Sequence, residues 1–152
     1  MINENRVLEY TDIEKLIPHR APFLLIDKLT NVVPGASATG IKAVCGGESY
    51  FGGHFPSNPV MPGVLILEAM AQVAACVASL TLKDDQKDTL VFLATIDKTR
   101  FRKPVRPGDL LMLNVQKIAS KANLWKFSAK ASVDSKIVAQ AEFSAMIVED
   151  DR

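Results

Sequence analysis

The sequence of 152 residues predicts an α+β fold in which a curved, mostly antiparallel sheet wraps around one long apolar helix. From Val64 to Leu82 the chain is apolar around every face of a helical wheel, interrupted mainly by Glu68 and Gln72. The C-terminal half alternates apolar and polar residues with the period of two that is typical of half-buried strands. A helix without a polar face needs a cover, and a strongly curved sheet supplies most of it.

Before the helix, Asp12–Leu16 is expected to form a helical turn that opens the domain, and Ala36–Val44 to form a strand. The segment Tyr50–Gly63, YFGGHFPSNPVMPG, follows as a loop, because its three glycines and three prolines mark a constrained, non-repetitive backbone. Pro62 and Gly63 then begin the helix, since proline fits the first turn, where its missing N–H is not needed.

After the helix, strands are expected over four ranges: Leu90–Ile96, Asp109–Ile118, Asn123–Val133 and Ile137–Ile147. In the third range every second residue is apolar, and a tight Asp134-Ser135 turn leads into the fourth. No linker or repeat divides the chain, so we expect a single domain over residues 1–152. One helix wrapped by such a sheet is the hot-dog arrangement. Because one sheet covers one side of the helix, a second copy of the chain is expected to cover the rest.

A transmembrane helix is the alternative interpretation, because Val64–Leu82 is just long enough to span a bilayer. The central Glu68, a costly carboxylate at mid-bilayer, and the amphipathic strands that follow favour a soluble domain instead. Residues Met1–Glu14 are too acidic and too poorly apolar for a signal or transit peptide. With only two cysteines, Cys45 and Cys76, we expect reduced, buried thiols and a cytoplasmic location.

Composition narrows the range of functions. The net charge of +1 gives no indication of binding to nucleic acid or to a membrane surface. Two histidines and the lack of a Cys-x-x-Cys pair argue against a zinc site. The sequence has no Gly-x-Ser-x-Gly elbow, Walker loop or Gly-x-Gly-x-x-Gly fingerprint, which argues against serine-nucleophile, nucleotide-dependent and dinucleotide chemistry. We therefore expect no metal or cofactor, and chemistry carried out by side-chain acids and bases.

His54 and Glu68 are the candidate base and acid. His54 is held between Gly53 and Phe55 in the constrained loop, although a lone histidine is more often structural. Glu68 lies in the second turn of the apolar helix, where burial raises the pKa of a carboxyl group, as a general acid needs near neutral pH. Gln72, four residues on, can orient Glu68 through a hydrogen bond. The alternative is a glutamate that reaches water through a gap in the core.

The start of the helix is a candidate oxyanion site. The backbone N–H groups of Gly63 and Val64 have no partner within the helix and lie at its positive end. They can polarise a thioester carbonyl and stabilise the enolate that forms when its α-proton is removed. A base, an acid and an oxyanion site together suit β-elimination of water next to a carbonyl.

Three blocks carry a family resemblance: PHRAPFLLID (Pro18–Asp27), GHFPSNPVMPGVLILEAMAQ (Gly53–Gln72) and IDKTRFRKPVRPGD (Ile96–Asp109). In this order, along nearly the whole chain, they resemble the Z-type (FabZ) β-hydroxyacyl-acyl carrier protein dehydratases. The resemblance implies the hot-dog fold and dehydration of (3R)-3-hydroxyacyl-acyl carrier protein to the trans-2-enoyl thioester in type II fatty acid biosynthesis. It also implies that His54 is the base toward the α-proton and Glu68 the acid for the departing 3-hydroxyl.

The resemblance further implies acyl carrier protein as partner, and a homodimer in which His54 and Glu68 meet across the interface, assembled as a trimer of dimers. The A-type dehydratase-isomerases carry aspartate at the position of Glu68, so dehydration without isomerisation is implied. Two departures from the family pattern are visible. Ser57 stands where the family often has glycine or an acidic residue, and Gly47 stands where asparagine is common. The resemblance implies that both changes can alter the loop that shapes the tunnel mouth.

Two further features have two interpretations each. His19 in PHRAPF has a structural interpretation, since neutral histidines readily satisfy buried backbone groups, and a functional one. The densest basic run is either a solvated strand edge or, as in similar dehydratases, a docking face for acidic acyl carrier protein. Its members are Lys98, Arg100, Arg102, Lys103 and Arg106.

Two rival functions fit the same fold. A hot-dog thioesterase would use a carboxylate to hydrolyse the thioester, but the His-Phe-Pro…Met-Pro-Gly block and the offset of Glu68 argue against it. A non-enzymatic acyl-thioester sensor is disfavoured by the presence of both His54 and Glu68 and by the lack of a DNA-binding appendage.

Overall fold

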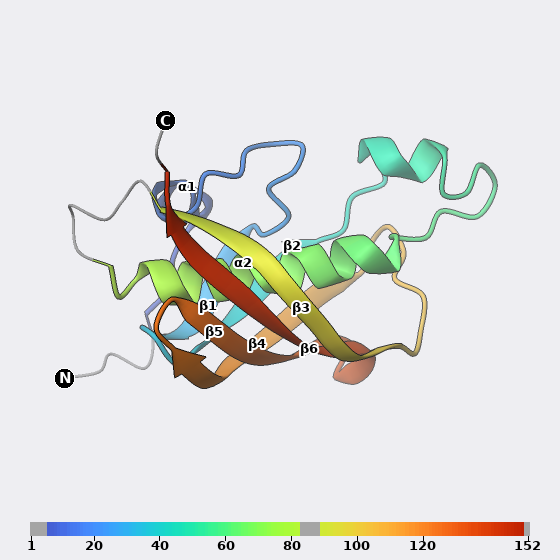
Figure 1. Ribbon diagram of the computed structural model, residues 1–152. Helices are drawn as coiled ribbons and strands as arrows, with labels where there is room; N and C mark the ends of the chain where they lie inside the picture. The colour runs from blue at the N-terminus through green and yellow to red at the C-terminus, as the bar shows by residue number, and fades with distance from the viewer. Residues whose placement is uncertain (1–5, 83–88, 151–152) are drawn as a thin grey trace.

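Figure 1 shows the computed structural model, which describes residues 6–82 and 89–150. The two ends of the expected 1–152 domain, residues 1–5 and 151–152, lie outside these ranges, as does part of the Met1–Glu14 segment. The elements follow in this order: α1 (Tyr10–Leu16), β1 (Lys28–Val33), β2 (Ser37–Ala43), the 3-10 helix η1 (Ser49–Gly52), α2 (Gly63–Ser79), β3 (Thr89–Phe101), β4 (Leu110–Lys121), β5 (Leu124–Val133) and β6 (Lys136–Glu149).

The strands form one six-stranded sheet in the order β1-β2-β4-β5-β6-β3, and each neighbouring pair is antiparallel. The sheet curves around α2, which contacts all six strands (Figure 1). This arrangement confirms the predicted hot-dog fold. β1 and β3 stand at the two ends of this order and are the edges of the sheet, although Leu29 of β1 also forms an isolated antiparallel bridge with Leu8.

The core lies between α2 and the concave face of the sheet. Phe127 on β5 and Phe143 on β6 are fully buried and stack with their ring centroids 5.7 Å apart. On β2 a side chain at Gly40 would bring its Cβ within 2.4 Å of Cγ2 of Val73, a distance that packed atoms do not tolerate. Glycine at this position therefore lets the helix lie directly against the sheet.

Local patterns predicted most elements correctly. The alternation in β5 is confirmed, since Phe127, Ala129 and Ala131 are buried and Lys130 is exposed. The tight turn after it is confirmed as well, with φ of 50° at Asp134 and 65° at Ser135, the positive values that two-residue hairpin turns adopt.

Three expectations need correction. The long helix ends at Ser79 and not at Leu82, because Thr81 turns back and donates from its hydroxyl to the carbonyl of Ala78 at 2.7 Å, which competes with helical hydrogen bonding. β1 was not expected as a strand, since Asn31 interrupts it with a φ of 51° where the pairing with β2 shifts register. The third correction is η1, a short 3-10 helix that occupies the start of the expected loop.

The two cysteines are free thiols. Cys76 is buried on α2, as predicted, and burial raises the pKa of its thiol to about 12. Cys45 is exposed, contrary to the prediction, because it lies in the turn after β2, where its sulfur accepts a hydrogen bond from the N–H of Gly47. Among the helices of residues 6–82 and 89–150, none is both long enough and apolar enough to cross a membrane.

Candidate active site

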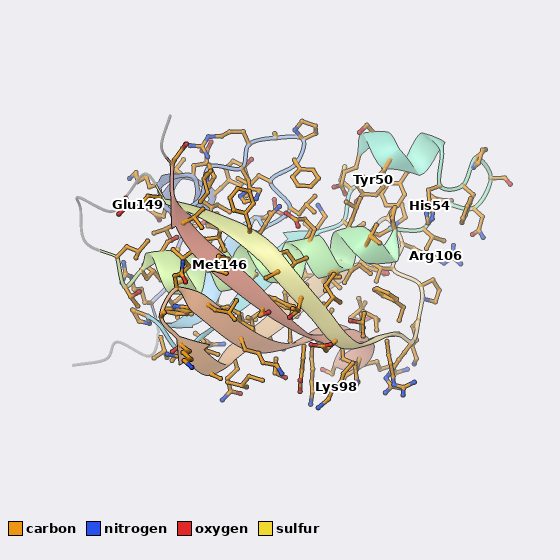
Figure 2. All side chains as sticks on the ribbon, in the orientation of Figure 1. Tyr50, His54, Lys98, Arg106, Met146 and Glu149 are labelled. Carbon is orange, nitrogen blue, oxygen red and sulfur yellow. The ribbon has the colours of Figure 1, made fainter. Side chains whose placement is uncertain are left out.

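His54 lies in the loop between η1 and α2, beyond the N-terminal end of the long helix (Figure 2). Its Nδ1 is 2.7 Å from the carbonyl oxygen of Val60. Because a carbonyl oxygen can only accept, Nδ1 carries a proton, and in the neutral ring Nε2 is left with a free lone pair. The ring also stacks on Phe55, with centroids 4.0 Å apart. This geometry presents Nε2 as a base.

Hydrogen bonds within the loop that carries His54, and to the turn before β4, hold this loop in place. Phe55 and Asn58 exchange two backbone hydrogen bonds, of 3.0 and 2.9 Å. The side-chain oxygen of Asn58 then accepts a hydrogen bond of 2.5 Å from Nη1 of Arg106. Arg106 is itself held at its backbone N–H, which donates to the carboxylate of Asp109 at 2.8 Å. The turn before β4 thereby fixes the loop in place.

A cavity of about 250 Å³ opens beside His54 and reaches the start of α2 at Gly63. Phe101, at the end of β3, packs against this glycine so closely that an added Cβ would meet its ring at 3.0 Å. Glycine at this position therefore lets the ring of Phe101 lie directly against the first turn of the helix. Val64 follows with its side chain 70% exposed.

Glu68 lies one turn further along α2, and its side chain is 24% exposed. Its Oε1 accepts a hydrogen bond of 3.2 Å from Nε2 of Gln72. Gln72 is buried and uses its remaining groups on the loop before β1, donating to the carbonyl of Phe23 and accepting from the N–H of Leu25, both at 2.8 Å. Both N–H groups and the oxygen of this amide are engaged, so the orientation of Glu68 is set by a fixed neighbour.

His19 is the neighbour of Glu68 that sequence reasoning did not find. Its Nε2 lies 3.6 Å from Oε1 of Glu68. Burial lowers the pKa of the His19 imidazole below its ordinary value, against the opposing effect of the Glu68 carboxylate. No spacing in the sequence could have paired these residues, because the fold alone brings the loop onto the helix.

Among the cavities lined by the described residues of one chain, His54 and Glu68 lie in two different ones. Glu68 and His19 line a small cavity of about 30 Å³ together with Val91 and Leu93 of β3. His54 lines the separate cavity that includes Gly63 and Phe101. A cavity of the size beside Glu68 has room for about one water-sized group.

The basic run is exposed, and Figure 2 shows its first and last members, Lys98 and Arg106, far apart on the molecule. Lys98 pairs with Glu142 at 3.6 Å. Arg102 donates to the side chain of Gln140 at 3.2 Å. Arg102 and Lys103 also line the cavity beside His54, so part of the basic run borders the candidate site.

Comparison with solved structures supports the fold. The dehydratase heterocomplex ApeI:P from Xenorhabdus doucetiae superimposes with a TM-score of 0.73 at 17% sequence identity, over 92% of this chain and 91% of that one. The protein PH1136 from Pyrococcus horikoshii gives a TM-score of 0.64 at 15% identity, over 90% and 93% of the two chains. At these identities the likeness concerns the fold alone.

Comparison of sequences identifies the family. The model of the FabA-like domain matches residues 17–142. The 3-hydroxyacyl-[acyl-carrier-protein] dehydratase FabZ of Gluconacetobacter diazotrophicus is 55% identical over 136 residues, which cover 90% of this chain and 84% of that protein. The protein of the same name from Rhodospirillum rubrum is 49% identical over 151 residues, 97% of this chain and 94% of the relative. The chain therefore belongs, as its motifs predicted, to the FabZ family of 3-hydroxyacyl-[acyl-carrier-protein] dehydratases.

Proposed function

We propose that this protein is a hydro-lyase that converts (3R)-3-hydroxyacyl-acyl carrier protein to the trans-2-enoyl thioester in the elongation cycle of fatty acid biosynthesis. Family membership supports the reaction and the substrate class. The observation that carries the mechanism is the hydrogen bond from Nδ1 of His54 to the carbonyl of Val60, which leaves the lone pair of Nε2 free in a residue that lines the cavity at the helix start. The whole chain acts as one dehydratase domain in this proposal.

The proposed reaction needs one proton removed and one delivered. Nε2 of His54 takes the proton from C2, and the N–H groups of Gly63 and Val64 hold the oxygen of the resulting enolate. Glu68 then protonates the 3-hydroxyl. The C3–O bond breaks, water leaves, and the electron pair from C2 forms the C2=C3 double bond. His54 afterwards releases its proton and Glu68 regains one, so that no metal or cofactor enters the cycle.

We propose that each site combines His54 of one chain with Glu68 of a second chain, because the two residues line separate cavities within one chain. The edge strand β3 supports this pairing. It is unpaired on one side and exposes apolar side chains, with Phe92 55%, Leu93 39% and Ile96 48% exposed. Unprotected edges of this kind invite pairing with another strand. A second β3 would join two sheets around a two-fold axis beside the cavity of Glu68.

Three finer points are part of the same proposal. On the family resemblance, three such dimers associate. The two free cysteines support a cytoplasmic location. The basic residues support docking of an acidic carrier protein, since Arg102 and Lys103 border the cavity of His54, where a carrier-linked thioester would enter.

The test is product analysis with the full chain and 3-hydroxyacyl-acyl carrier proteins of increasing acyl length. The expected product is the enoyl thioester, still attached to the carrier. Release of the free carrier thiol would show hydrolysis and would contradict the proposal. Incubation with the trans-2-enoyl thioester should run the reaction in reverse and return the 3-hydroxyacyl compound, which a thioesterase cannot do.

A further inference from the structure

His19 is fastened in place by its neighbours on both sides. The guanidinium of Arg20 donates to the backbone carbonyls of Ile17 at 2.9 Å, His19 at 2.7 Å and Glu14 at 2.9 Å, which fixes the loop against the end of α1. A few residues further on, Gln72 ties the same loop to α2. The amide of Gln72 that orients Glu68 thus also positions the loop that carries His19.

The two ring nitrogens of His19 differ in their surroundings. Nδ1 is buried and has no hydrogen-bond partner within the described part of the chain. Nε2 lies 3.6 Å from Oε1 of Glu68. A proton on Nδ1 would leave a buried donor without an acceptor and would turn a lone pair toward the carboxyl oxygen. A proton on Nε2 turns a donor toward that oxygen, so electrostatics favour the Nε2–H form.

We propose that His19 is a positioning residue for Glu68, and this inference rests on the proposed role of Glu68 as the acid. The N–H groups of His19 and Gln72 both approach Oε1. Oε1 is held as the accepting oxygen, and Oε2 carries the proton that reaches the leaving hydroxyl. Without the N–H of His19, the carboxyl group can rotate and place its proton on Oε1 instead of Oε2.

Substitution of His19 separates positioning from packing. In His19→Leu the N–H that lies 3.6 Å from Oε1 is lost. We expect kcat to fall about tenfold, because this approach closes to one hydrogen bond when substrate is bound, while KM stays unchanged. In His19→Gln a side-chain N–H can still reach Oε1, and most of kcat should be retained. Thermal unfolding of both variants shows whether their stabilities are equal. Equal losses of kcat in the two variants at equal stability would overturn the proposal, as would a change in KM alone.

Nuclear magnetic resonance of the wild-type protein tests the protonation of His19 without an activity measurement. The chain has two histidines, and nitrogen chemical shifts of labelled imidazoles report which ring nitrogen carries the proton. At a pH well above the ordinary histidine pKa, His19 should be protonated on Nε2 and His54 on Nδ1. A proton on Nδ1 of His19 would overturn the present inference. A proton on Nε2 of His54 would instead contradict the proposed role of His54 as the general base. The experiment therefore distinguishes failure of the inference on His19 from failure of the proposed function.

Discussion

Nη1 of Arg106 donates a hydrogen bond of 2.5 Å to the side-chain oxygen of Asn58, and this contact joins the turn before β4 to the loop that carries His54. The guanidinium also reaches the carbonyl of Pro59 at 3.4 Å. Arg106, a residue that the basic run suggested for docking, therefore holds the loop that carries His54, whatever contact it makes with a carrier protein.

Arg106→Met keeps the length of the side chain and removes its donors. We expect kcat to fall about tenfold on carrier-linked and on small thioester substrates alike, because a freed loop misplaces the imidazole. Arg100→Met, on the exposed edge strand, is the matched control and should leave the small substrate unaffected. A loss confined to the carrier-linked substrate would show that Arg106 acts in docking alone.

Docking is tested by reversing charges that do not hold the loop. The double variant Lys98→Glu/Arg100→Glu, at two residues that do not line the cavity beside His54, should raise KM for carrier-linked substrate about tenfold at low salt, and less at high salt, where screening weakens the attraction. Turnover of a small thioester without the carrier should barely change. Equal losses on both substrates would point to a damaged site and against docking.

The base is tested at His54. His54→Ala should lower turnover at least about 10²-fold, the usual size of a general-base contribution, while the fold survives. Circular dichroism and chromatographic size provide the control for folding. A folded variant with near-native dehydration would remove His54 from the mechanism.

The close approach of α2 to β2 predicts a stability effect. Gly40→Ala should destabilise the protein by about 1–3 kcal/mol in denaturant unfolding, as overpacking of a filled core does, because the new Cβ would lie 2.4 Å from Cγ2 of Val73. Gly52→Ala is the control, since a Cβ there meets nothing within 4 Å. Adding Val73→Ala to the first variant should recover part of the loss. Equal stabilities of Gly40→Ala and Gly52→Ala would contradict this account of the packing.

The shared site is tested by complementation. His54→Ala and Glu68→Ala proteins, each inactive alone, should regain about a quarter of native activity when unfolded and refolded together, because half of the dimers are then mixed and have one intact site of two. Mixing the folded variants should give less. Refolded mixtures that contain mixed dimers and remain inactive would place both residues in one site of one chain.

The sequence predicted those features that arise from local order. The period of two in β5 and β6, the apolar run of α2 and the turn residues before it act over a few positions, so they can be recognised without a structure. The contact of His19 with Glu68 and the clamp of Arg106 on Asn58 join segments 48 or 49 residues apart. Contacts of this kind depend on the packing of the whole sheet and leave no periodic signal.

The placement of His54 and Glu68 in the sequence illustrates the same limit. A separation of fourteen positions, with a constrained loop and a helix start between them, suggests a compact pair. The structure instead gives each residue its own cavity, because α2 directs Glu68 toward β3 while the loop extends past the end of the helix. The motif identifies the candidate residues, but whether they lie close together within one chain depends on the fold.

The separate cavities have a genetic consequence under the shared-site proposal. In a mixed dimer with a normal chain, the double variant His54→Ala/Glu68→Ala takes the base from one site and the acid from the other, so neither site is intact. A chain with one substitution leaves its normal partner one complete site. With equal amounts of normal and altered chain, about half of the activity survives a single substitution and about a quarter survives the double one. The doubly altered chain therefore inactivates each normal chain with which it pairs. A singly altered chain only lowers the number of intact sites in proportion to its share of the chains.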